Sequence, residues 1–377
     1  MIELKITGVQ TICMRVPYAE SQRVKSALGT WNHRNGMFLL IQTDEGITGL
    51  GEIFSNFPQW SHYEKEASVH CGLKPLLLGE DPLDMEGIRE RVTGKLERIG
   101  LQWGGIGIAN QILSGLDIAL WDLRGKVEGR PVFALLGQST RRVPVYCSGL
   151  GPDRVVESAR RLLDRGVDAF KLKIGMDRAQ DLQNLSALRR LIGPDRMLMA
   201  DVNQGWDLQT ALEMAPLLEA FQLHWVEEPL RADDVKGLEV LVKTTSLRIA
   251  GGENLYGEDF ERHLSRGWLQ VCQPDVTKCG GITRMLEIAA VAARYGVEVA
   301  PHFFANGVGY AATMHVMDAV GAKRMEYDHG GNPMKDSCII GAGAVEHGTV
   351  PVPQGPGLGI SLNEEEIAKY RFVPYAV

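Results

Sequence analysis

The 377-residue sequence predicts an α/β fold in which a parallel β/α barrel follows an N-terminal α+β domain. From residue 143 onward, short apolar runs alternate with amphipathic segments, which is typical of a parallel sheet with helical crossovers. Several runs are apolar throughout, as expected for parallel strands that are buried on both faces. Charged residues follow consecutive runs at nearly regular intervals. In a β/α barrel this position, the carboxyl end of each strand, is where active sites are built.

Eight strand candidates lie in this second part of the chain, and eight parallel strands imply closure into a barrel. Helical patterns separate them, for example at 154–163, 179–191, 210–221, 283–295 and 310–320. The strand candidates are Val143–Cys147, Ala169–Ile174, Met197–Val202, His224–Glu227, Leu247–Ala250, Leu269–Cys272, Val297–Ala300 and Arg324–Tyr327.

The first part of the chain combines strands and helices without strict alternation. Strand-like runs at 2–15 and 37–43 are followed by a turn at 44–46, which suggests a hairpin. Helical patterns come next at about 61–78, 83–97 and 107–127.

These patterns divide the chain into two domains. We expect an α+β capping domain at 1–128 and the β/α barrel at 129–355. The tail at 356–377 has no place in the barrel, so we expect it to pack back on the first domain and complete it.

The composition excludes several classes of protein. Hydrophobic residues make up 45% and charged residues 23% of the chain, as is ordinary for soluble globular proteins. The net charge of -7 argues against a nucleic-acid partner, because binding to phosphates requires a basic surface. The six cysteines contain no CxxC pair and suit buried positions in a reducing compartment. Since no run approaches the ~18 apolar residues of a membrane span and no signal peptide is recognisable, we expect a cytoplasmic protein.

Three acidic residues end apolar runs at equal spacing. Asp201, Glu227 and Glu253 are each 26 residues apart, close to the roughly 30 residues of a strand with its crossover. At the ends of neighbouring strands, three carboxylates repel one another unless a cation lies between them. Mg²⁺ fits best, because it prefers oxygen ligands and no His or Cys lies among the three. The alternative is that each acid is a surface residue or a helix cap.

Two lysines lie two positions apart in a predicted strand, so Lys171 and Lys173 point to the same side. The alternating Phe170, Leu172 and Ile174 suit the side covered by helices, which leaves the lysines for the barrel mouth. A lysine near another cation and a metal is expected to have a lowered pKa, which suits a general base. The alternative is that both lysines face solvent.

Further polar residues end the later strands. Asp275 and His302 follow the sixth and seventh candidates, where neighbouring strands can bring them within hydrogen-bond distance, and an aspartate raises the basicity of a histidine. Glu326 ends the eighth, where a carboxyl group kept protonated in a dry site can donate to an oxyanion. Asn203 is a candidate substrate contact or else a turn-forming residue.

Together these residues resemble the enolase superfamily, and within it the mandelate racemase subgroup. The resemblance spans nearly the whole chain, and the ordered set is far more specific than any single motif. The matching pieces are Lys171-Leu-Lys173, Ala200-Asp-Val-Asn-Gln204, Val226-Glu-Glu-Pro229, Gly252-Glu-Asn254, Gln273-Pro-Asp275 with Gly280-Gly281, His302, Glu326-Tyr327, and Ala119-Leu-Trp-Asp-Leu-Arg-Gly125.

The resemblance implies a modified, TIM-like barrel under a capping domain and a symmetric homo-oligomer. It implies that Mg²⁺ and nearby cations hold the carboxylate of a small-molecule substrate, that one of two bases removes the α-proton, and that the enediolate is stabilised. The implied residues are Asp201, Glu227 and Glu253 for Mg²⁺, Lys171 to orient the substrate carboxylate, Lys173 and the His302–Asp275 pair as the two bases, and Glu326 for the enediolate.

The step after proton abstraction is open. With a β-hydroxyl on the substrate, His302 can protonate the leaving hydroxide and the product is a 2-keto-3-deoxy acid. Without a leaving group, reprotonation on the other face gives a racemase or epimerase of 2-hydroxy acids. Members with this set of bases resemble acid-sugar dehydratases, so we predict a dehydratase. The segment 16–35, unless it is an ordinary solvated loop, favours a polyhydroxylated substrate through Glu20, Arg23, Lys25, Ser26, Trp31, Asn32 and His33.

Other relatives and classes fit less well. Muconate-lactonising and dipeptide-epimerase relatives carry a lysine where Asp275 stands, and Lys278 is three residues too far along to replace it. A Schiff-base aldolase with Lys173 as nucleophile would not need three aligned acids. A non-catalytic barrel would have no reason to keep costly buried charges.

Overall fold

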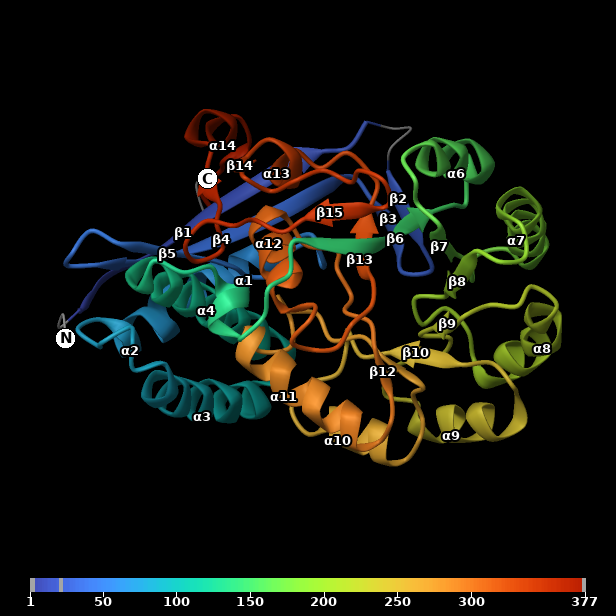
Figure 1. The fold of residues 1–377 in the computed structure, drawn as a ribbon. Coiled ribbons are helices and arrows are strands. Elements are labelled where there is room, and N and C mark those ends of the chain that lie inside the picture. The colour runs from blue at the N-terminus through green and yellow to red at the C-terminus, as the bar shows by residue number, and fades with distance from the viewer. Residues whose placement is uncertain (1–3, 20–22, 375–377) are drawn as a thin grey trace.

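The β-then-α alternation expected from residue 143 onward is present in the computed structural model, which describes residues 4–19 and 23–374. All eight predicted strands form. Consecutive strands from β6 to β12 pair in parallel, and β13 pairs in parallel with β6. Figure 1 shows their helices on the outside. The strands are β6 (Arg142–Leu150), β7 (Ala169–Lys173), β8 (Met197–Asp201), β9 (Val226–Glu227), β10 (Ile249–Gly251), β11 (Val271–Cys272), β12 (Glu298–Val299) and β13 (Met325–Asp328).

The hydrogen-bonded order of the sheet is β12-β11-β10-β9-β8-β7-β6-β13, so β12 and β13 are its ends. No ladder joins these two strands in the part of the chain that the structure describes. The backbone N–H of Phe303, after β12, instead donates to Glu326 Oε2 in β13 at 3.1 Å. The antiparallel strand β15 (Thr349–Pro351) pairs with β6 outside the main path. The fold is thus the modified β/α barrel that the sequence predicts.

The interior of the barrel is filled below its mouth. Tyr146 and Trp225 meet edge-to-face with ring centroids 5.5 Å apart, and smaller side chains from the other strands complete the layer. This layer makes the barrel a packed core and not a pore, as is usual for the fold. Its buried members are Tyr146, Ala169, Met199, Trp225, Ala250, Val271 and Ala300.

The N-terminal part is an antiparallel sheet covered by helices. Its strands are β1 (Ile6–Pro17), β4 (His33–Thr43) and β5 (Thr48–Glu52), in the order β1-β4-β5. The predicted hairpin is confirmed, because Gln42 pairs with Thr48 across the turn at 44–46. Helix α4 (Ile106–Glu128) lies against β5 so closely that a Cβ on Gly51 would be 1.9 Å from the carbonyl oxygen of Gly115.

The remaining elements follow the predicted pattern. Near the mouth, β2 (Val24–Ser26) and β3 (Gly29–Trp31) form a short hairpin. The short strands β14 (Ile339–Ile340) and β16 (Ser361–Leu362) pair together. The other helices are α1 (Ser61–Ala67), a π-helical turn (Ser68–Leu73), α2 (Lys74–Leu77), α3 (Met85–Trp103), α5 (Val132–Leu135), α6 (Val155–Asp164), α7 (Arg178–Ile192), α8 (Leu208–Glu219), α9 (Val235–Thr244), α10 (Asp259–Ser265), α11 (Gly281–Arg294), α12 (Gly307–Val316), α13 (Pro333–Asp336) and α14 (Glu364–Tyr370).

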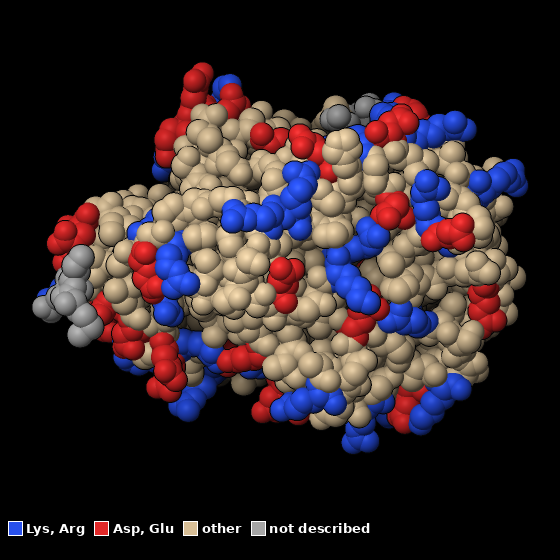
Figure 2. Space-filling model, in the orientation of Figure 1, with Lys and Arg blue, Asp and Glu red and all other residues tan. Residues whose placement is uncertain are grey.

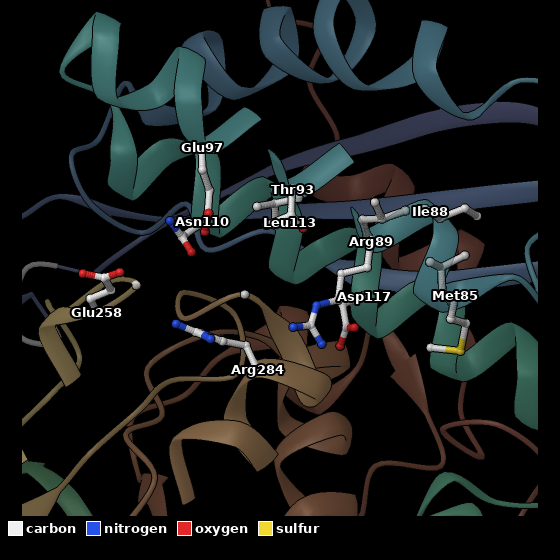
Figure 3. Close-up of a pocket in the computed structure, with 14 residues that line it drawn as sticks. Met85, Ile88, Arg89, Thr93, Glu97, Asn110, Leu113, Asp117, Glu258 and Arg284 are labelled. Carbon is white, nitrogen blue, oxygen red and sulfur yellow. The ribbon is translucent and has the colours of Figure 1, made fainter. Parts of the chain in front are cut away.

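The cap docks on the barrel through α4 and α11. Asp117 accepts hydrogen bonds from the backbone N–H and the hydroxyl of Thr283, at 2.9 and 2.6 Å. Beside this contact lies a cavity of about 340 Å³, where Asn110 and Asp117 face Arg284 and Glu258 (Figure 3). Burial raises the pKa of Asp117 to about 6, against the opposing effect of its hydrogen bonds to Thr283. We regard this contact as structural because Asp117 is satisfied by the first turn of α11.

The tail returns to the cap, where α14 lies near β1 in Figure 1. Arg371 forms an isolated bridge with Met14, and the Phe372 N–H donates to the carbonyl oxygen of Cys13 at 3.0 Å. These contacts are those expected for a tail that packs on the first domain. The boundaries at 128/129 and 355/356 stay our interpretation of the sequence.

On the face seen in Figure 2, acidic and basic side chains are interspersed. Within the described ranges, no helix combines the length and the apolar character needed to cross a membrane. Five of the cysteines are buried as expected, but Cys71 is exposed.

His315, in α12, is a structural histidine that should make stability depend on pH. Its Nδ1 accepts from the Phe133 N–H at 3.2 Å, and its Nε2 contacts the Leu358 carbonyl at 3.0 Å. Burial lowers its pKa to about 4. Below a pKa of about 6.5 the unfolded chain therefore binds a proton that the folded protein does not, so the free energy of unfolding should fall by about 3 kcal/mol between pH 6.5 and 4.

The measurement is urea denaturation of the wild type and of His315→Gln at pH 7 and pH 4.5. Glutamine can keep a hydrogen bond but does not titrate, and all other groups are common to both proteins. We expect the variant to lose less stability than the wild type on acidification. An identical loss in both proteins would show that His315 is not the buried neutral group described.

Candidate active site

A cavity of about 350 Å³ lies where the loops of the cap meet the carboxyl ends of the barrel strands. Trp31, Phe54 and Asn56 line it from the cap. The predicted site residues that line it from the barrel are Lys173, Asn203, Glu253, His302 and Glu326.

Two of the three predicted metal ligands are neighbours in register. Asp201 is paired with Lys173 on one side and with Glu227 on the other. Glu253 is not in register with them, because Glu227 is paired with Ala250. The equal spacing in sequence is therefore misleading for the third acid, which follows β10 on a turn. Gly252 begins that turn with φ of 139°, and a Cβ there would be 2.9 Å from the backbone nitrogen of Gln273.

Lys171 is enclosed by the acids beneath the cavity, with only 1% of its surface exposed. Its Nζ lies 2.7 and 2.8 Å from the two carboxylate oxygens of Glu227 and 2.8 Å from Glu326 Oε1. Burial opposes its charge, but Glu227 and Glu326 outweigh burial and raise its pKa well above the ordinary value. The sequence correctly predicts that Lys171 points inward, opposite to Phe170 and Leu172, which lie in the main core under the helices. A contact with the substrate carboxylate stays a prediction, since Lys171 does not line the cavity.

Lys173 does line the cavity, and its electrostatic environment differs from the expected one. Its Nζ donates to Asp201 Oδ2 at 2.5 Å and to Asn203 Oδ1 at 2.7 Å. Burial favours the neutral amine, yet Asp201 outweighs both burial and the charge of Lys171, so the pKa is raised. The lowered pKa predicted from the sequence includes the charge of a metal and stays a prediction, although it overlooked how closely Asp201 approaches Lys173.

Asn203 is a turn-forming residue and also lies at the cavity, where a substrate contact is possible. Its backbone has φ of 47°, as a turn-forming asparagine does. Its backbone N–H donates to Asp201 Oδ1 at 2.9 Å, while its side-chain oxygen accepts from Lys173. The turn thus holds Asn203 beside the lysine at the edge of the cavity.

The predicted histidine–aspartate pair is present. His302 Nδ1 lies 2.7 Å from Asp275 Oδ2, and Asp275 also accepts from the backbone N–H and hydroxyl of Thr277. The other ring nitrogen, Nε2, is 3.2 Å from Glu253 Oε2. Burial opposes protonation of the ring, but Glu253, Glu326 and Asp275 outweigh it and raise the pKa of His302 to about 9. The aspartate fixes the ring and leaves Nε2 directed at the cavity.

Glu326 accepts hydrogen bonds from protein groups on both of its oxygens, and its donation to an oxyanion stays a prediction. Lys171 Nζ lies 2.8 Å from Oε1, while the Tyr146 hydroxyl and the Phe303 N–H donate to Oε2 at 3.2 and 3.1 Å. Each of these partners supplies a hydrogen. Tyr146 reaches this carboxylate because β6 pairs with β13, and Phe303 reaches it from the loop after β12.

The acidic side chains of the site fit a hard divalent cation. Burial and then Asp201 raise the pKa of Glu227 to about 7, and burial and then Glu253 raise the pKa of Glu228 to about 8. Within residues 4–19 and 23–374 no three ligand side chains already surround one point as a metal site would, and each predicted ligand is paired with a lysine. Buried acids exceed buried cations here. The acids are Asp201, Glu227, Glu228, Glu253, Asp275 and Glu326, and the cations are Lys171, Lys173, Lys278 and His302.

Oxygen donors gathered at adjacent strand ends, where carboxyl groups outnumber the cations around them, are the donor set that Mg²⁺ prefers. Asp201, Glu227 and Glu253 would hold it, and Glu228 lies next to them. The identification of these three as ligands stays a proposal.

Two residues of the site were missed in the sequence. Lys278 was set aside in the sequence as too distant to replace Asp275, but its Nζ lies 3.0 Å from both Glu253 Oε2 and Asn254 Oδ1 and it lines the cavity. Asn56 is 3% exposed and lines the cavity, and its Oδ1 has no hydrogen-bond partner among the described residues. The position of Lys278 close to Asp275 in the sequence could have indicated that it belongs to the site, whereas Asn56 lies in a loop without a recognisable motif.

The polar segment at 16–35 folds largely as the hairpin of β2 and β3, close to the mouth of the barrel. Ser26, Leu28 and Trp31 line the cavity, so the segment contributes apolar as well as polar surface. Of the residues singled out in the sequence, Glu20 lies outside the described part of the chain.

Fold and site agree with the families that the sequence matches. Residues 8–137 match the mandelate racemase / muconate lactonizing enzyme N-terminal domain, and residues 154–366 match the enolase C-terminal domain-like family. The protein therefore belongs to the enolase superfamily and to its mandelate racemase group.

Particular relatives narrow the comparison. The chain is 30% identical over 386 residues to the D-galactarolactone cycloisomerase of Agrobacterium fabrum, covering 98% of this chain and 99% of the relative. It is 34% identical over 361 residues to the D-galactonate dehydratase of Variovorax paradoxus, covering 88% and 90%. The solved L-talarate/galactarate dehydratase of Salmonella typhimurium, liganded with Mg and L-lyxarohydroxamate, superposes with a TM-score of 0.84 at 28% identity, covering 99% and 94%. The chain is thus an enzyme similar to dehydratases and cycloisomerases.

Proposed function

We propose that the protein is a Mg²⁺-dependent dehydratase of acid sugars, a hydro-lyase that forms a 2-keto-3-deoxy sugar acid. The observation that carries this proposal is that Lys173 and His302 line one cavity together with Glu253 and Glu326. Because β7 and β12 are not neighbours in the sheet, the two candidate bases approach a substrate from different sides. The dehydratases among the relatives support the same reaction.

The chemistry can be followed at named atoms. Lys173 Nζ first loses one of its own protons to solvent as its hydrogen bond to Asp201 is released, and the neutral amine then takes the α-proton. The electron pair left on the α-carbon expels the β-hydroxyl group, and His302 Nε2 gives it a proton so that it leaves as water. The enol that remains tautomerises to the 2-keto-3-deoxy acid. In total one molecule of water is lost and nothing is oxidised or reduced.

Bound Mg²⁺ would supply positive charge that attracts the substrate carboxylate and stabilises the negative charge developing on it. Asp275 keeps the ring of His302 oriented through the contact at Nδ1. Glu326, held by Lys171, Tyr146 and Phe303, is fixed at the side of the cavity near His302. If the configuration at the α-carbon directs the proton toward His302, then His302 is the base that removes it and Lys173 is the acid that protonates the leaving hydroxide.

The racemase or epimerase alternative uses the same two bases. Without a β-hydroxyl group in position, the second base would return a proton to the α-carbon on the opposite face. The two-sided placement of Lys173 and His302 favours neither outcome by itself, and the choice depends on the substrate.

The proposal is tested by incubating the purified protein and Mg²⁺ with a library of mono- and diacid sugars and detecting 2-keto acids with semicarbazide. We expect turnover of at least one sugar acid. If no acid gives a keto product while the α-proton of one exchanges with solvent, the racemase alternative replaces the dehydratase.

Asn56 should contribute to substrate binding, because it lines the cavity and its buried Oδ1 has no hydrogen-bond partner among the described residues, while its Nδ2 donates to the Phe304 carbonyl at 2.5 Å. Removing a hydrogen bond to a buried polar group costs about 1–3 kcal/mol, so Asn56→Ala should raise KM by roughly 10-fold with little change in kcat. The control is Asn110→Ala, which also removes a buried amide that donates to a backbone carbonyl, but outside both this cavity and the substrate path. An unchanged KM for Asn56→Ala would remove Asn56 from the binding site.

A further inference from the structure

A second cavity adjoins the candidate active site. It has a volume of about 520 Å³ and lies between the carboxyl end of β6, the N-terminus of α6 and the loop after β13. Gly149, Lys173 and Phe304 line both cavities. A molecule whose α-carbon lies at Lys173 can therefore extend from the first cavity into the second.

The lining of this second cavity is basic, although the protein as a whole is acidic with a net charge of -7. The only acids that line it in the described chain are Asp153 and Asp328. Its cations are Arg23, Lys25, Arg34, Arg154, Arg161 and Lys173.

Two of these cations are neutralised by the two acids. Arg34 and Asp328 form a buried ion pair at 2.5 Å, and Arg34 also donates to the carbonyl groups of Phe304 and Ala305, so this pair builds the wall. Lys25 Nζ lies 3.0 Å from Asp153 Oδ2, which joins the β2–β3 hairpin to the loop before α6. Both acids are thus paired, and the positive charge that remains is in excess.

The excess is concentrated on α6. Arg154 directly precedes the helix and its side chain has no hydrogen bond or ion pair among the described residues. Arg161, two turns later, pairs with the exposed Glu157 at 2.5 Å and donates to Ser158 Oγ at 3.1 Å. Arg154 has φ of 55°, a conformation that arginine rarely adopts, and no side chain caps the helix. The uncapped first turn adds its own partial positive charge to the cavity.

We infer that the second cavity is a subsite for a second carboxylate, so that the substrates of this enzyme are sugar diacids. The inference rests on the proposed function, because it assumes that the reacting carboxyl end occupies the first cavity. Guanidinium groups bind carboxylates through two parallel hydrogen bonds, and two arginines on one helix face are suited to hold such a group. A sugar monoacid would leave a hydroxymethyl group among these cations.

The experiment compares matched acids that differ only at the far end: gluconate with glucarate, and galactonate with galactarate. Calorimetry in the presence of Mg²⁺ gives the dissociation constants, and semicarbazide detection in the same samples gives product formation. The variants are Arg154→Asn and Arg161→Gln, since asparagine tolerates the positive φ at position 154. The control is Arg160→Gln, an exposed arginine on the same helix that does not line the cavity.

We expect the wild-type enzyme to bind at least one diacid about 10-fold or more tightly than its monoacid partner, since a charge-assisted hydrogen bond contributes at least that much. Arg154→Asn and Arg161→Gln should remove most of this preference while changing monoacid binding less than about 3-fold, and Arg160→Gln should retain it. Equal binding of both members of each pair, or a preference that survives both variants, would overturn the subsite. Tighter binding of 6-phosphogluconate than of glucarate would overturn the assignment to a carboxylate.

The two proposals fail in different ways. Turnover of monoacids without a preference for diacids would overturn the subsite and leave the dehydratase. A diacid preference that depends on Arg154, without any keto product, would retain the subsite and overturn the dehydratase.

Discussion

His302→Asn is expected to abolish dehydration while the protein stays folded. Asparagine cannot deliver a proton to the leaving hydroxide, and general acid–base groups contribute about 10²–10⁴-fold to rate, so kcat should fall by at least that range. The nearest partners of the ring, Asp275 and Glu253, stay in place and can still bind their other neighbours. The measurement is the rate of 2-keto acid formation with the sugar acid found in the screen.

The matched control is His224→Asn. His224 also faces a glutamate, Glu298, at 3.4 Å, but it lies beside Pro144 and Met197 at the amino end of the barrel strands. We expect this variant to keep normal turnover. Full dehydration by His302→Asn would show that the acid is a different group and that the mechanism proposed above is wrong.

Glu253→Gln is expected to remove the dependence on Mg²⁺ together with the activity. The amide keeps the size of the side chain but not its charge, and the loss of one charged ligand should lower activity by at least ~100-fold. EDTA should inactivate the wild-type enzyme, and added Mg²⁺ should restore it. The measurement is kcat as a function of Mg²⁺ concentration.

The control for this experiment is Glu239→Gln on α9, where the exposed glutamate pairs only with Lys243 on the surface. This variant should show the Mg²⁺ response of the wild type. If the wild-type enzyme is fully active in EDTA, the three acids are not metal ligands, and the lysines that already contact them must be their permanent partners.

The sequence predicted the barrel well because its strands are buried on both faces and therefore appear in the sequence as continuous apolar runs. Each predicted strand formed within a few residues of its expected position. Asp201 and Lys173 end such strands, so their meeting at 2.5 Å is a result of strand pairing. Glu253 lies after a turn, and spacing along the chain does not determine the position of a residue beyond the end of its strand.

Energetic details were harder to predict than positions. The pKa of Lys173 depends on whether Asp201, Lys171 or a metal is closest to its Nζ, and sequence does not give those distances. Asn56 and Arg154 were not recognised, since each acts from a loop whose conformation depends on contacts with distant parts of the chain. Arg154 gains its importance only where the loop after β6 meets the β2–β3 hairpin.

The most direct test of the central claim is proton NMR of a sugar acid incubated with the enzyme and Mg²⁺ in D₂O. The proposed reaction removes the α-proton and then the β-hydroxyl group, so the α-proton signal should disappear as a 2-keto-3-deoxy acid with deuterium at C3 is formed. Loss of the α-proton without a keto product would indicate racemisation. Persistence of the α-proton in every acid of the library would contradict proton abstraction by Lys173 and His302, and with it the account of this site.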